Sequence, residues 1–388
     1  MEEVKKIKIL FRIRSMETGG VQKVLLNILN HLDKNIFDIT LLLNLYQGEL
    51  IKEIPESIKV QYIGKGREFM NSNSFIKKFQ LITRAAKLKL YSKFPRLLYK
   101  NLKLYDQDVE VAFFHYNYDD VLNSPNLKSK KIGWMHGDIK NITINGNKEK
   151  FVAKFLRFNT MVYVSQQTMK SAKSFNDQIA ANAKIIYNPI EVDDIIAKSK
   201  LKSNIKISSL KNDSIQSFIS VGRIKPGKGY QLLIEAHKKL IDDGLYHKIY
   251  IVGEGEYKEE LLKKVKEYRI EETFIFLGEH SNPYPLIKEA DYFILPSFSE
   301  AYPLVIAESL ILEKPIITTD VGGIREMMVD QENGIFIPSK NEQALYEAIK
   351  TLLSDPKKVQ FFIENNKKCK EIFSPVTIYK EIEKLLTK

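Results

Sequence analysis

Residues 217–236 read SFISVGRIKPGKGYQLLIEA, and this stretch decides the fold class. Its first residues are apolar or small, which is typical of a buried strand, and apolar residues then recur at helical spacing from Tyr230. Between them lies a short loop with three glycines and three lysine or arginine side chains. A buried strand that leads through a short loop into a helix is the repeating unit of a parallel α/β sheet.

The same alternation recurs on both sides of this stretch. In the C-terminal half the strand-like runs are KIYIVG, TFIFLG, DYFILPS, KPIITTD and NGIFIP; in the N-terminal half they are KIKILFRI, FDITLLLN, IKVQYIG, VEVAFFHY, KIGWMHG, TMVYVS and AKIIYNPI. A polar stretch, residues 198–214, separates the halves and is predicted to be the interdomain region. We therefore expect two doubly wound domains, residues 1–197 and 198–370, and a C-terminal helix over 371–388 that packs back toward the first domain.

The composition narrows the cellular setting. The chain has 388 residues, a formal net charge of +12 and a single cysteine, which excludes an intramolecular disulfide. Its N-terminal apolar run is interrupted by Arg12 and Arg14, unlike a signal peptide, and no run approaches the length of a spanning helix. We expect a soluble, cytoplasmic protein with an anionic partner.

The loop of the opening stretch favours phosphate binding. Gly222 and Gly229 permit a tight backbone path, Arg223 and Lys228 flank the turn, and a helix begins directly afterwards. Such a loop suits a diphosphate, although a solvated basic loop has the same composition. Gly19 and Gly20 precede a helix in the N-terminal half in the same way, but they form neither a dinucleotide fingerprint nor a Walker A motif.

Two carboxylates follow the strand-like run DYFILPS. Glu300 and Glu308 lie in SFSEAYPLVIAES, and Pro303 predicts a helix that begins at Pro303 or Leu304. The amide groups at that helix start would donate to phosphate or sugar oxygens, while ionised carboxylates accept hydrogen bonds from vicinal hydroxyls. A nucleotide-sugar carries diols on both sides of a diphosphate. Taken singly, each glutamate also fits an ordinary surface or helix-start acid.

These motifs resemble those of glycosyltransferase family 4. The resemblance rests on PSFSEAYPLVIAESLILEKPIITTDVGGIREMM, SVGRIKPGKGYQLLIEA and IVGEGEYKEELL, and more loosely on METGGVQKVLLNIL, GWMHGD, VYVSQ and YNPIE in the N-terminal half. It departs from the family where Glu300-Ala301-Tyr302 replaces the usual Glu-Gly-Phe. The resemblance implies a retaining, nucleotide-sugar-dependent enzyme of the GT-B fold, in which two Rossmann-like domains face each other across a cleft.

The resemblance also implies a role for individual residues. His136, Glu300, Arg223 and Lys228 would be the catalytic set. Arg223 and Lys228 would hold the donor diphosphate, Glu308 the ribose hydroxyls and Glu300 the hydroxyls of the transferred sugar. The implied donor-binding residues are Gly19, Gly20, Gly222, Arg223, Lys228, Gly253, Gly278, Glu279, His280, Glu300, Ala301, Tyr302, Pro303, Leu304, Val305 and Glu308. Glu279 and His280 would border the base, which the sequence leaves open between uracil, guanine and adenine.

His136 follows the strand-like run KIGWM, and its place there and the resemblance favour a role in the site over a structural one. His136 and Asp138 are the N-terminal candidates for a general base, so inversion stays open on the residues alone. Six histidines and one cysteine show no metal-ligand spacing, and no Asp-x-Asp occurs. We expect no metal and no cofactor, with a UDP- or GDP-linked sugar as substrate.

A basic stretch from Lys77 to Lys103 lies within a segment, Phe69 to Tyr105, that contains no acidic residue. Its cations alternate with apolar residues, which suits an anionic membrane surface. A solvated helix face that covers the core explains the apolar part equally well, and no nucleic-acid module is visible. We expect a transferase that moves a hexosyl or N-acetylhexosaminyl group to a glycan or lipid-linked acceptor in bacterial surface polysaccharide synthesis, peripheral on the inner face of the plasma membrane. A nucleotide-sugar epimerase or an inactive sugar-binding subunit are the alternatives.

Overall fold

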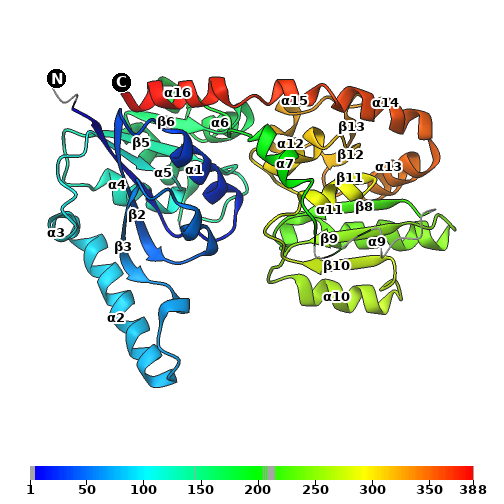
Figure 1. Ribbon diagram of the computed structural model, residues 1–388, viewed down its shortest axis with the longest axis horizontal. Helices are drawn as coiled ribbons and strands as arrows, with labels where there is room; N and C mark the ends of the chain where they lie inside the picture. The colour runs from blue at the N-terminus through cyan, green and yellow to red at the C-terminus, as the bar shows by residue number, and fades with distance from the viewer. Residues whose placement is uncertain (1–4, 145, 204, 206, 208–214, 388) are drawn as a thin grey trace. The chain divides into compact units, whose positions relative to one another are not determined.

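A computed structural model describes residues 5–144, 146–203, 205, 207 and 215–387. The chain divides into two compact units: residues 1–189 with 376–388, and residues 190–375 (Figure 1). Each unit is a parallel sheet with helices connecting its strands, as the alternation in the sequence predicts. The expected α/β class is confirmed.

The N-terminal unit holds a seven-stranded sheet in the order β3-β2-β1-β4-β5-β6-β7, in which every pairing is parallel. Its strands are β1 Ile7–Ile13, β2 Phe37–Tyr46, β3 Lys59–Lys65, β4 Val109–Ala112, β5 Lys130–Met135, β6 Thr160–Tyr163 and β7 Ala183–Ile185. Its α-helices are α1 Gly20–His31, α2 Ser74–Lys93, α3 Pro95–Asn101, α4 Tyr118–Leu122, α5 Lys148–Ala153, α6 Gln166–Lys173 and α16 Val376–Thr387.

The second unit holds a six-stranded sheet in the order β10-β9-β8-β11-β12-β13, also parallel throughout. Its strands are β8 Ser217–Val221, β9 Lys248–Val252, β10 Phe274–Gly278, β11 Tyr292–Leu295, β12 Ile316–Thr319 and β13 Gly334–Ile337. Its described α-helices are α7 Val192–Lys198, α9 Tyr230–Asp242, α10 Lys258–Glu267, α11 Tyr284–Glu289, α12 Leu304–Ile311, α13 Glu342–Ser354, α14 Pro356–Asn366 and α15 Cys369–Ile372. The strand order turns back between β8 and β11, which is where a doubly wound sheet binds ligands.

The observed unit boundaries lie close to the expected ones but not on them. The first unit ends at Pro189, whereas the sequence suggested residue 197, because α7 contacts α11 and α12 of the second unit. The chain returns to the first unit at Val376 rather than at 371. Most of the expected interdomain stretch, residues 204, 206 and 208–214, lies outside the described residues.

The C-terminal helix α16 is tied to the N-terminal unit by specific contacts. The ring of Tyr379 stacks on His31 of α1 with centroids 3.9 Å apart. The ammonium group of Lys130 donates to the backbone oxygen of Leu385 over 2.6 Å. The last helix of the chain therefore belongs to the first unit.

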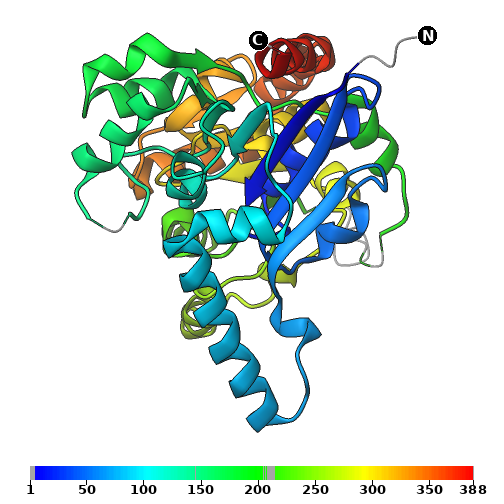
Figure 2. The same cartoon turned by 90° about the vertical axis from the view of Figure 1, so that its left-hand side faces the viewer.

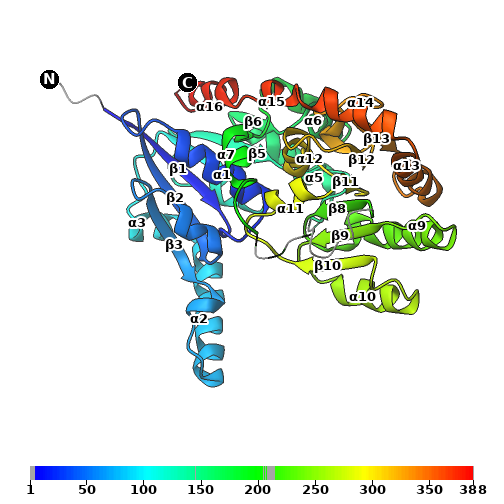
Figure 3. The ribbon, with the colours of Figure 1, turned by 45° about the vertical axis from the view of Figure 1, so that its right-hand side comes forward.

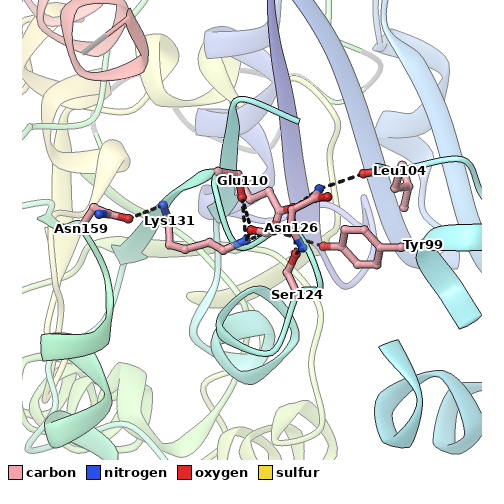
Figure 4. A network of polar contacts seen from close by, with 8 residues as sticks. Tyr99, Leu104, Glu110, Ser124, Asn126, Lys131 and Asn159 are labelled. Atoms are coloured by element: carbon pink, nitrogen blue, oxygen red, sulfur yellow. Dashed lines mark hydrogen bonds and ion pairs between the residues drawn. The ribbon is translucent and has the colours of Figure 1, made fainter. Parts of the chain in front are cut away.

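A buried carboxylate network holds the N-terminal sheet together at the end opposite to the ligand-binding edge (Figure 4). Glu110, the second residue of β4, is fully buried and pairs with Lys131 of β5 at 2.7 Å. Tyr99, Ser124 and Asn126 donate to the same carboxylate over 3.2, 2.9 and 2.7 Å. The three hydrogen bonds and the ammonium group of Lys131 compensate the buried charge.

Helix α2 stands out from the sheet beyond β3 (Figure 2). Its partly or fully buried positions, among them Leu81, Arg84, Leu88 and Tyr91, follow helical spacing and make the face that packs inward. Phe75, Phe79 and Ile82 lie on the opposite face and are 83%, 64% and 59% exposed. Covering the core therefore accounts for the inward residues such as Leu88, but not for the exposed Phe79 and Ile82.

Candidate active site

The site in the second unit is built on the loops that follow β8 and β11, neighbouring strands whose carboxyl ends meet at one edge of the sheet. Gly229 has φ +72°, and a Cβ atom there would overlap with the carbonyl oxygen of Pro296. The amide of Phe298 donates to the carbonyl of Gly227 over 2.8 Å. These close approaches press the glycine-rich loop after β8 against the segment that carries Glu300.

Lys228 and Glu300 meet directly at the centre of this arrangement. The Lys228 ammonium lies 2.7 Å from Oε1 of Glu300, and the two side chains are 14% and 13% exposed. Burial alone would lower the pKa of Lys228, but the Glu300 carboxylate more than offsets this and the pKa is raised. Lys228 therefore stays positively charged beside Gly222, where its ammonium would lie 3.6 Å from an added Cβ atom.

The segment around Glu300 is anchored from a third strand. Gly322, which follows β12, has φ +60°, and a Cβ atom there would overlap with the carbonyl oxygen of Glu300. The amide of Gly323 donates to the carbonyl of Ala301 over 2.8 Å. Helix α12 then begins at Leu304, as Pro303 predicts, so its first amides lie next to this segment.

Glu308, one turn into α12, is only 7% exposed. It accepts a hydrogen bond of 3.1 Å from the hydroxyl of Tyr284 in α11. Burial is the main cause that raises the pKa of Tyr284, and the Glu308 charge raises it further, so the phenol remains a donor. Tyr284 thus holds this carboxylate in place, a role that no sequence pattern indicates.

Arg223 differs from Lys228 in its surroundings. Its side chain is 75% exposed and its Nε atom lies 3.5 Å from the Glu256 carboxylate, a spacing that gives a weak, solvated pair. Of the two cations predicted to hold the diphosphate, Lys228 is therefore enclosed and Arg223 is exposed. Diphosphate binding by either residue remains a prediction.

The predicted base-side residues follow β9 and β10 at the same sheet edge. Gly253 directly follows β9 and Gly278 is the last residue of β10, and the amide of Gly253 donates to the carbonyl of Gly278 over 2.7 Å. Glu279 is exposed, and the ring of His280 bonds the carbonyl of Leu277 through Nε2 at 3.2 Å. They are placed beyond strand ends, as the sequence indicates, and base contact stays a prediction.

In the N-terminal unit His136 follows β5 and lies in an aromatic cluster. Its ring lies 4.8 Å from that of Phe113 and 6.1 Å from that of Trp134. Burial lowers the pKa of His136 to about 3, and the nearby His115 adds to this, so the imidazole is neutral at physiological pH. Its Nε2 atom is buried and has no hydrogen-bond partner among the described residues, which marks it for a ligand or a water.

His115, which follows β4, is a second histidine of this cluster that the sequence reasoning did not single out. Both of its ring nitrogens are buried without a partner in the described part of the chain, and burial lowers its pKa to about 4. His115 directly follows the strand-like run VEVAFF, and this position beyond a strand end would have indicated it as a candidate site residue. Asp138, the other general-base candidate, accepts from the hydroxyl of Ser171 and the amide of Lys140, so it is engaged locally.

Gly19 and Gly20 lie where β1 gives way to α1, so their backbone is at the carboxyl edge of the N-terminal sheet. Within the described residues no group of three or more His, Cys, Asp or Glu side chains is placed to hold a metal ion. No described helix has the length and apolarity needed to cross a membrane.

The comparisons with known proteins agree with this geometry. Residues 202–369 match the family described as "Glycosyl transferases group 1". The crystal structure of Anabaena Alr3699/HepE in complex with UDP superimposes with a TM-score of 0.73 over 98% of this chain and 100% of that one, at 20% identity. The chain has the GT-B fold, and the family match lies within its second half.

Two curated relatives that this chain resembles come from Campylobacter jejuni. The N-acetylgalactosamine-N,N'-diacetylbacillosaminyl-diphospho-undecaprenol 4-alpha-N-acetylgalactosaminyltransferase is 28% identical and covers 96% of this chain and 98% of its own length. The GalNAc-alpha-(1->4)-GalNAc-alpha-(1->3)-diNAcBac-PP-undecaprenol alpha-1,4-N-acetyl-D-galactosaminyltransferase is 26% identical and covers 94% of both chains. Both similarities extend through the N-terminal unit, where the sequence motifs were weaker.

Proposed function

We propose that this glycosyltransferase moves an N-acetylhexosamine from a nucleoside-diphosphate donor to a lipid-linked glycan in bacterial polysaccharide synthesis, with retention of anomeric configuration. The observation that carries the proposal is the Lys228–Glu300 pair, at 2.7 Å, next to the start of α12. The pair places two groups next to each other: an ammonium group that would bind the leaving diphosphate, and a carboxylate that would accept hydrogen bonds from sugar hydroxyls. The acceptor class is supported by the two relatives from Campylobacter jejuni, whose names specify undecaprenol-linked acceptors.

The enclosed cation supports a leaving-group role. Lys228 is charged and largely shielded from water, so its field acts on a neighbouring phosphate with little solvent screening. Together with the free amides of α12 it would stabilise the negative charge that develops on the departing diphosphate. We therefore propose that turnover needs no divalent metal, and that it survives excess chelator. Loss of turnover with EDTA and its return with Mg²⁺ or Mn²⁺ would contradict this.

Retention is supported by the neutral form of the His136 imidazole in the N-terminal unit. Because the pKa of His136 is lowered to about 3, its ring is a weak base that orients a hydroxyl better than it removes a proton. Proton transfer from the acceptor to the departing phosphate on the same face would then replace a protein base. NMR of the product's anomeric proton tests this: an α-linked donor gives an α-glycoside, and a β-product contradicts retention.

We also propose that α2 contacts an anionic membrane surface. Its outer face carries Phe75, Phe79 and Ile82, and Lys78 and Lys89 flank this apolar stripe at helical spacing. The enzyme should sediment with anionic liposomes and dissociate as salt rises, and Lys78→Glu with Lys89→Glu should weaken this binding. Equal binding to neutral vesicles, or no binding, would contradict it.

The experiment that tests the proposed function follows nucleotide release from a panel of UDP- and GDP-sugars, with and without membrane-lipid extract. A transferase releases nucleotide from one donor faster when the extract is present, and the labelled sugar moves into the lipid fraction. An epimerase converts the donor without any acceptor, and an inactive sugar-binding subunit releases nothing. The variant Lys228→Met should abolish the signal, whereas Lys225→Met, in the same loop but exposed, should retain it.

A further inference from the structure

A short run of aromatic residues directly after β4 carries side chains that have no role in the reaction described above. This aromatic turn consists of Phe114 and the 3₁₀ turn His115–Asn117, which leads into α4. Strand β4 lies between β1 and β5 in the N-terminal sheet, and β1 in turn lies beside β2 (Figure 3). Because β4 is parallel to both of its neighbours, the aromatic turn lies at the carboxyl edge of the sheet, where His136 follows β5.

Polar contacts hold the aromatic turn against β1. The Asp120 carboxylate of α4 pairs with the guanidinium group of Arg12 in β1 over 3.2 Å, and it accepts a hydrogen bond of 2.9 Å from the side-chain amide of Asn117. Arg12 and Asn117 are both buried. The backbone amide of Asn117 donates to the carbonyl of Phe114 over 2.9 Å, which closes the turn. The residues between Phe114 and Asn117 therefore have a fixed backbone.

The ring of His115 lacks the hydrogen bonds that a buried imidazole needs. Neither of its nitrogens has a partner in the described part of the chain, although both are buried. Burial lowers the pKa of His115 to about 4, so at physiological pH the ring is neutral, with one N–H donor and one acceptor nitrogen. Most buried polar side-chain atoms in proteins are paired, because an unpaired one has lost its bonds to water without replacement. His115 therefore calls for a ligand group that both donates and accepts hydrogen bonds.

Tyr116 provides an aromatic surface beside this histidine. Its side chain is 57% exposed, and its ring lies 4.2 Å from that of His115 and 5.1 Å from that of Phe114. The ring of Phe151 in α5 meets His115 edge-on, with the centroids 6.3 Å apart. An exposed ring that packs on neighbouring rings is a preformed apolar surface, which costs little entropy when a ligand binds to it.

A pyranose ring fits both features. Its C–H groups pack on the face of an aromatic ring, and its hydroxyls each donate and accept hydrogen bonds. A phosphate fits poorly, because residues 114–117 include no lysine or arginine and the guanidinium of Arg12 is paired with Asp120. A purely apolar ligand would leave the nitrogens of His115 without partners. The chemistry of the aromatic turn therefore favours a sugar.

We propose that the aromatic turn binds the terminal sugar of the acceptor glycan, with the pyranose ring packed on Tyr116 and one of its hydroxyls hydrogen-bonded to His115. This rests on the proposed function, which supplies a glycan acceptor and assigns the transferred sugar to Glu300 in the second unit. The turn recognises the acceptor by its last sugar and holds a hydroxyl of that sugar close to His136. Loss of these contacts raises KM for the acceptor and leaves the affinity for UDP unchanged.

Saturation-transfer NMR with soluble glycosides tests the proposal without requiring sugar transfer. The probes are the methyl glycosides of N-acetylgalactosamine, N-acetylglucosamine and glucose, with saturating UDP present. The wild type should bind at least one of them, Tyr116→Ala should bind it roughly five- to tenfold more weakly, and Tyr116→Phe should retain most of the binding. The matched control is Tyr246→Ala, a tyrosine of the second unit that is 53% exposed, and it should bind like the wild type. Equal binding by Tyr116→Ala and the wild type, or no binding of any probe to the wild type, overturns the proposal.

Variants of His115 separate a ligand contact from a structural role. His115→Phe keeps an aromatic ring but removes both nitrogens, so glycoside binding should weaken roughly five- to tenfold. His115→Gln restores a donor and an acceptor and should recover part of the binding. Because the nitrogens have no partner in the described part of the chain, the free energy of unfolding in urea should not fall in either variant. Lower stability with unchanged glycoside binding would make His115 a structural residue, and the proposal would be wrong.

Calorimetry distinguishes the acceptor sugar from the donor sugar. Tyr116→Ala and His115→Gln should bind both UDP and a UDP-N-acetylhexosamine with wild-type affinity. Normal binding of UDP with weaker binding of the UDP-sugar would place the donor sugar at the aromatic turn and contradict the proposal. In transfer assays both variants should raise KM for the acceptor and leave KM for the donor unchanged. Absence of transfer by the wild type would count against the proposed function, while glycoside binding still decides the sugar site.

Discussion

The pairing of Lys228 with Glu300 leads to an unusual expectation for Glu300→Gln: nucleotide binding should become tighter while turnover falls. The Lys228 ammonium and the Glu300 carboxylate lie 2.7 Å apart. At an effective dielectric of about 20 their direct attraction is about 6 kcal/mol, and an arriving diphosphate has to compete with it. The ammonium has three donors, so it can bind phosphate while it keeps one contact to the carboxylate.

Only part of this attraction is therefore lost when UDP binds. We expect Glu300→Gln to bind UDP more tightly than the wild type by about 1.5 kcal/mol, which is a roughly tenfold lower Kd. Calorimetric titration of UDP into Glu300→Gln measures it, with Glu272→Gln, an exposed acid of the same unit, as the matched control. Turnover should fall at the same time, because the amide is a weaker acceptor for sugar hydroxyls. Weaker UDP binding by Glu300→Gln would refute the view that the carboxylate competes with the diphosphate for Lys228.

Three other expectations follow from groups outside this pair. The variant His136→Ala should lower kcat and leave UDP affinity unchanged in calorimetry, because that ring lies in the N-terminal unit; full activity would remove it from the site. The buried pair His237–His247, 2.9 Å apart, should make the protein acid-sensitive. Burial lowers the pKa of both rings, that of His247 to about 4, so below the ordinary value of 6.5 the unfolded chain takes up protons that the folded chain resists. The free energy of unfolding should fall between pH 6.5 and about 4, and His247→Gln should flatten the slope in urea titrations; an unaltered slope would contradict this. Finally, Glu110→Leu should cost about 3–5 kcal/mol in urea unfolding, since it leaves the buried Lys131 without its counter-charge, and a loss below about 1 kcal/mol would show that the network is dispensable.

Much of the fold could be predicted from the sequence because each strand of the parallel sheets is a short apolar run followed by a turn. Pro303 located the start of α12, and the switch from strand to helix at Gly229–Tyr230 was equally clear. The first boundary was placed too late because α7 resembles the helices of either half, and only its contacts with α11 and α12 assign it.

The sequence indicates candidate site residues one by one, but it does not indicate the contacts between them. The sequence predicts that Lys228 and Glu300 bind different parts of the donor. The two residues are 72 positions apart, and no local pattern indicates that their side chains pair with each other. The exposure of Arg223 likewise depends on how its loop is pressed against the β11 segment.

The central claim is that a nucleotide-sugar bound at Lys228 and Glu300 donates its sugar to a lipid-linked acceptor. The most direct measurement is transfer of radiolabelled sugar from UDP-N-acetylhexosamines into the lipid fraction of a bacterial membrane extract, by the wild type and by Lys228→Met. The account predicts labelled lipid and stoichiometric UDP release for the wild type, and neither for the variant. UDP release without labelled lipid, or equal labelling by both proteins, would contradict it.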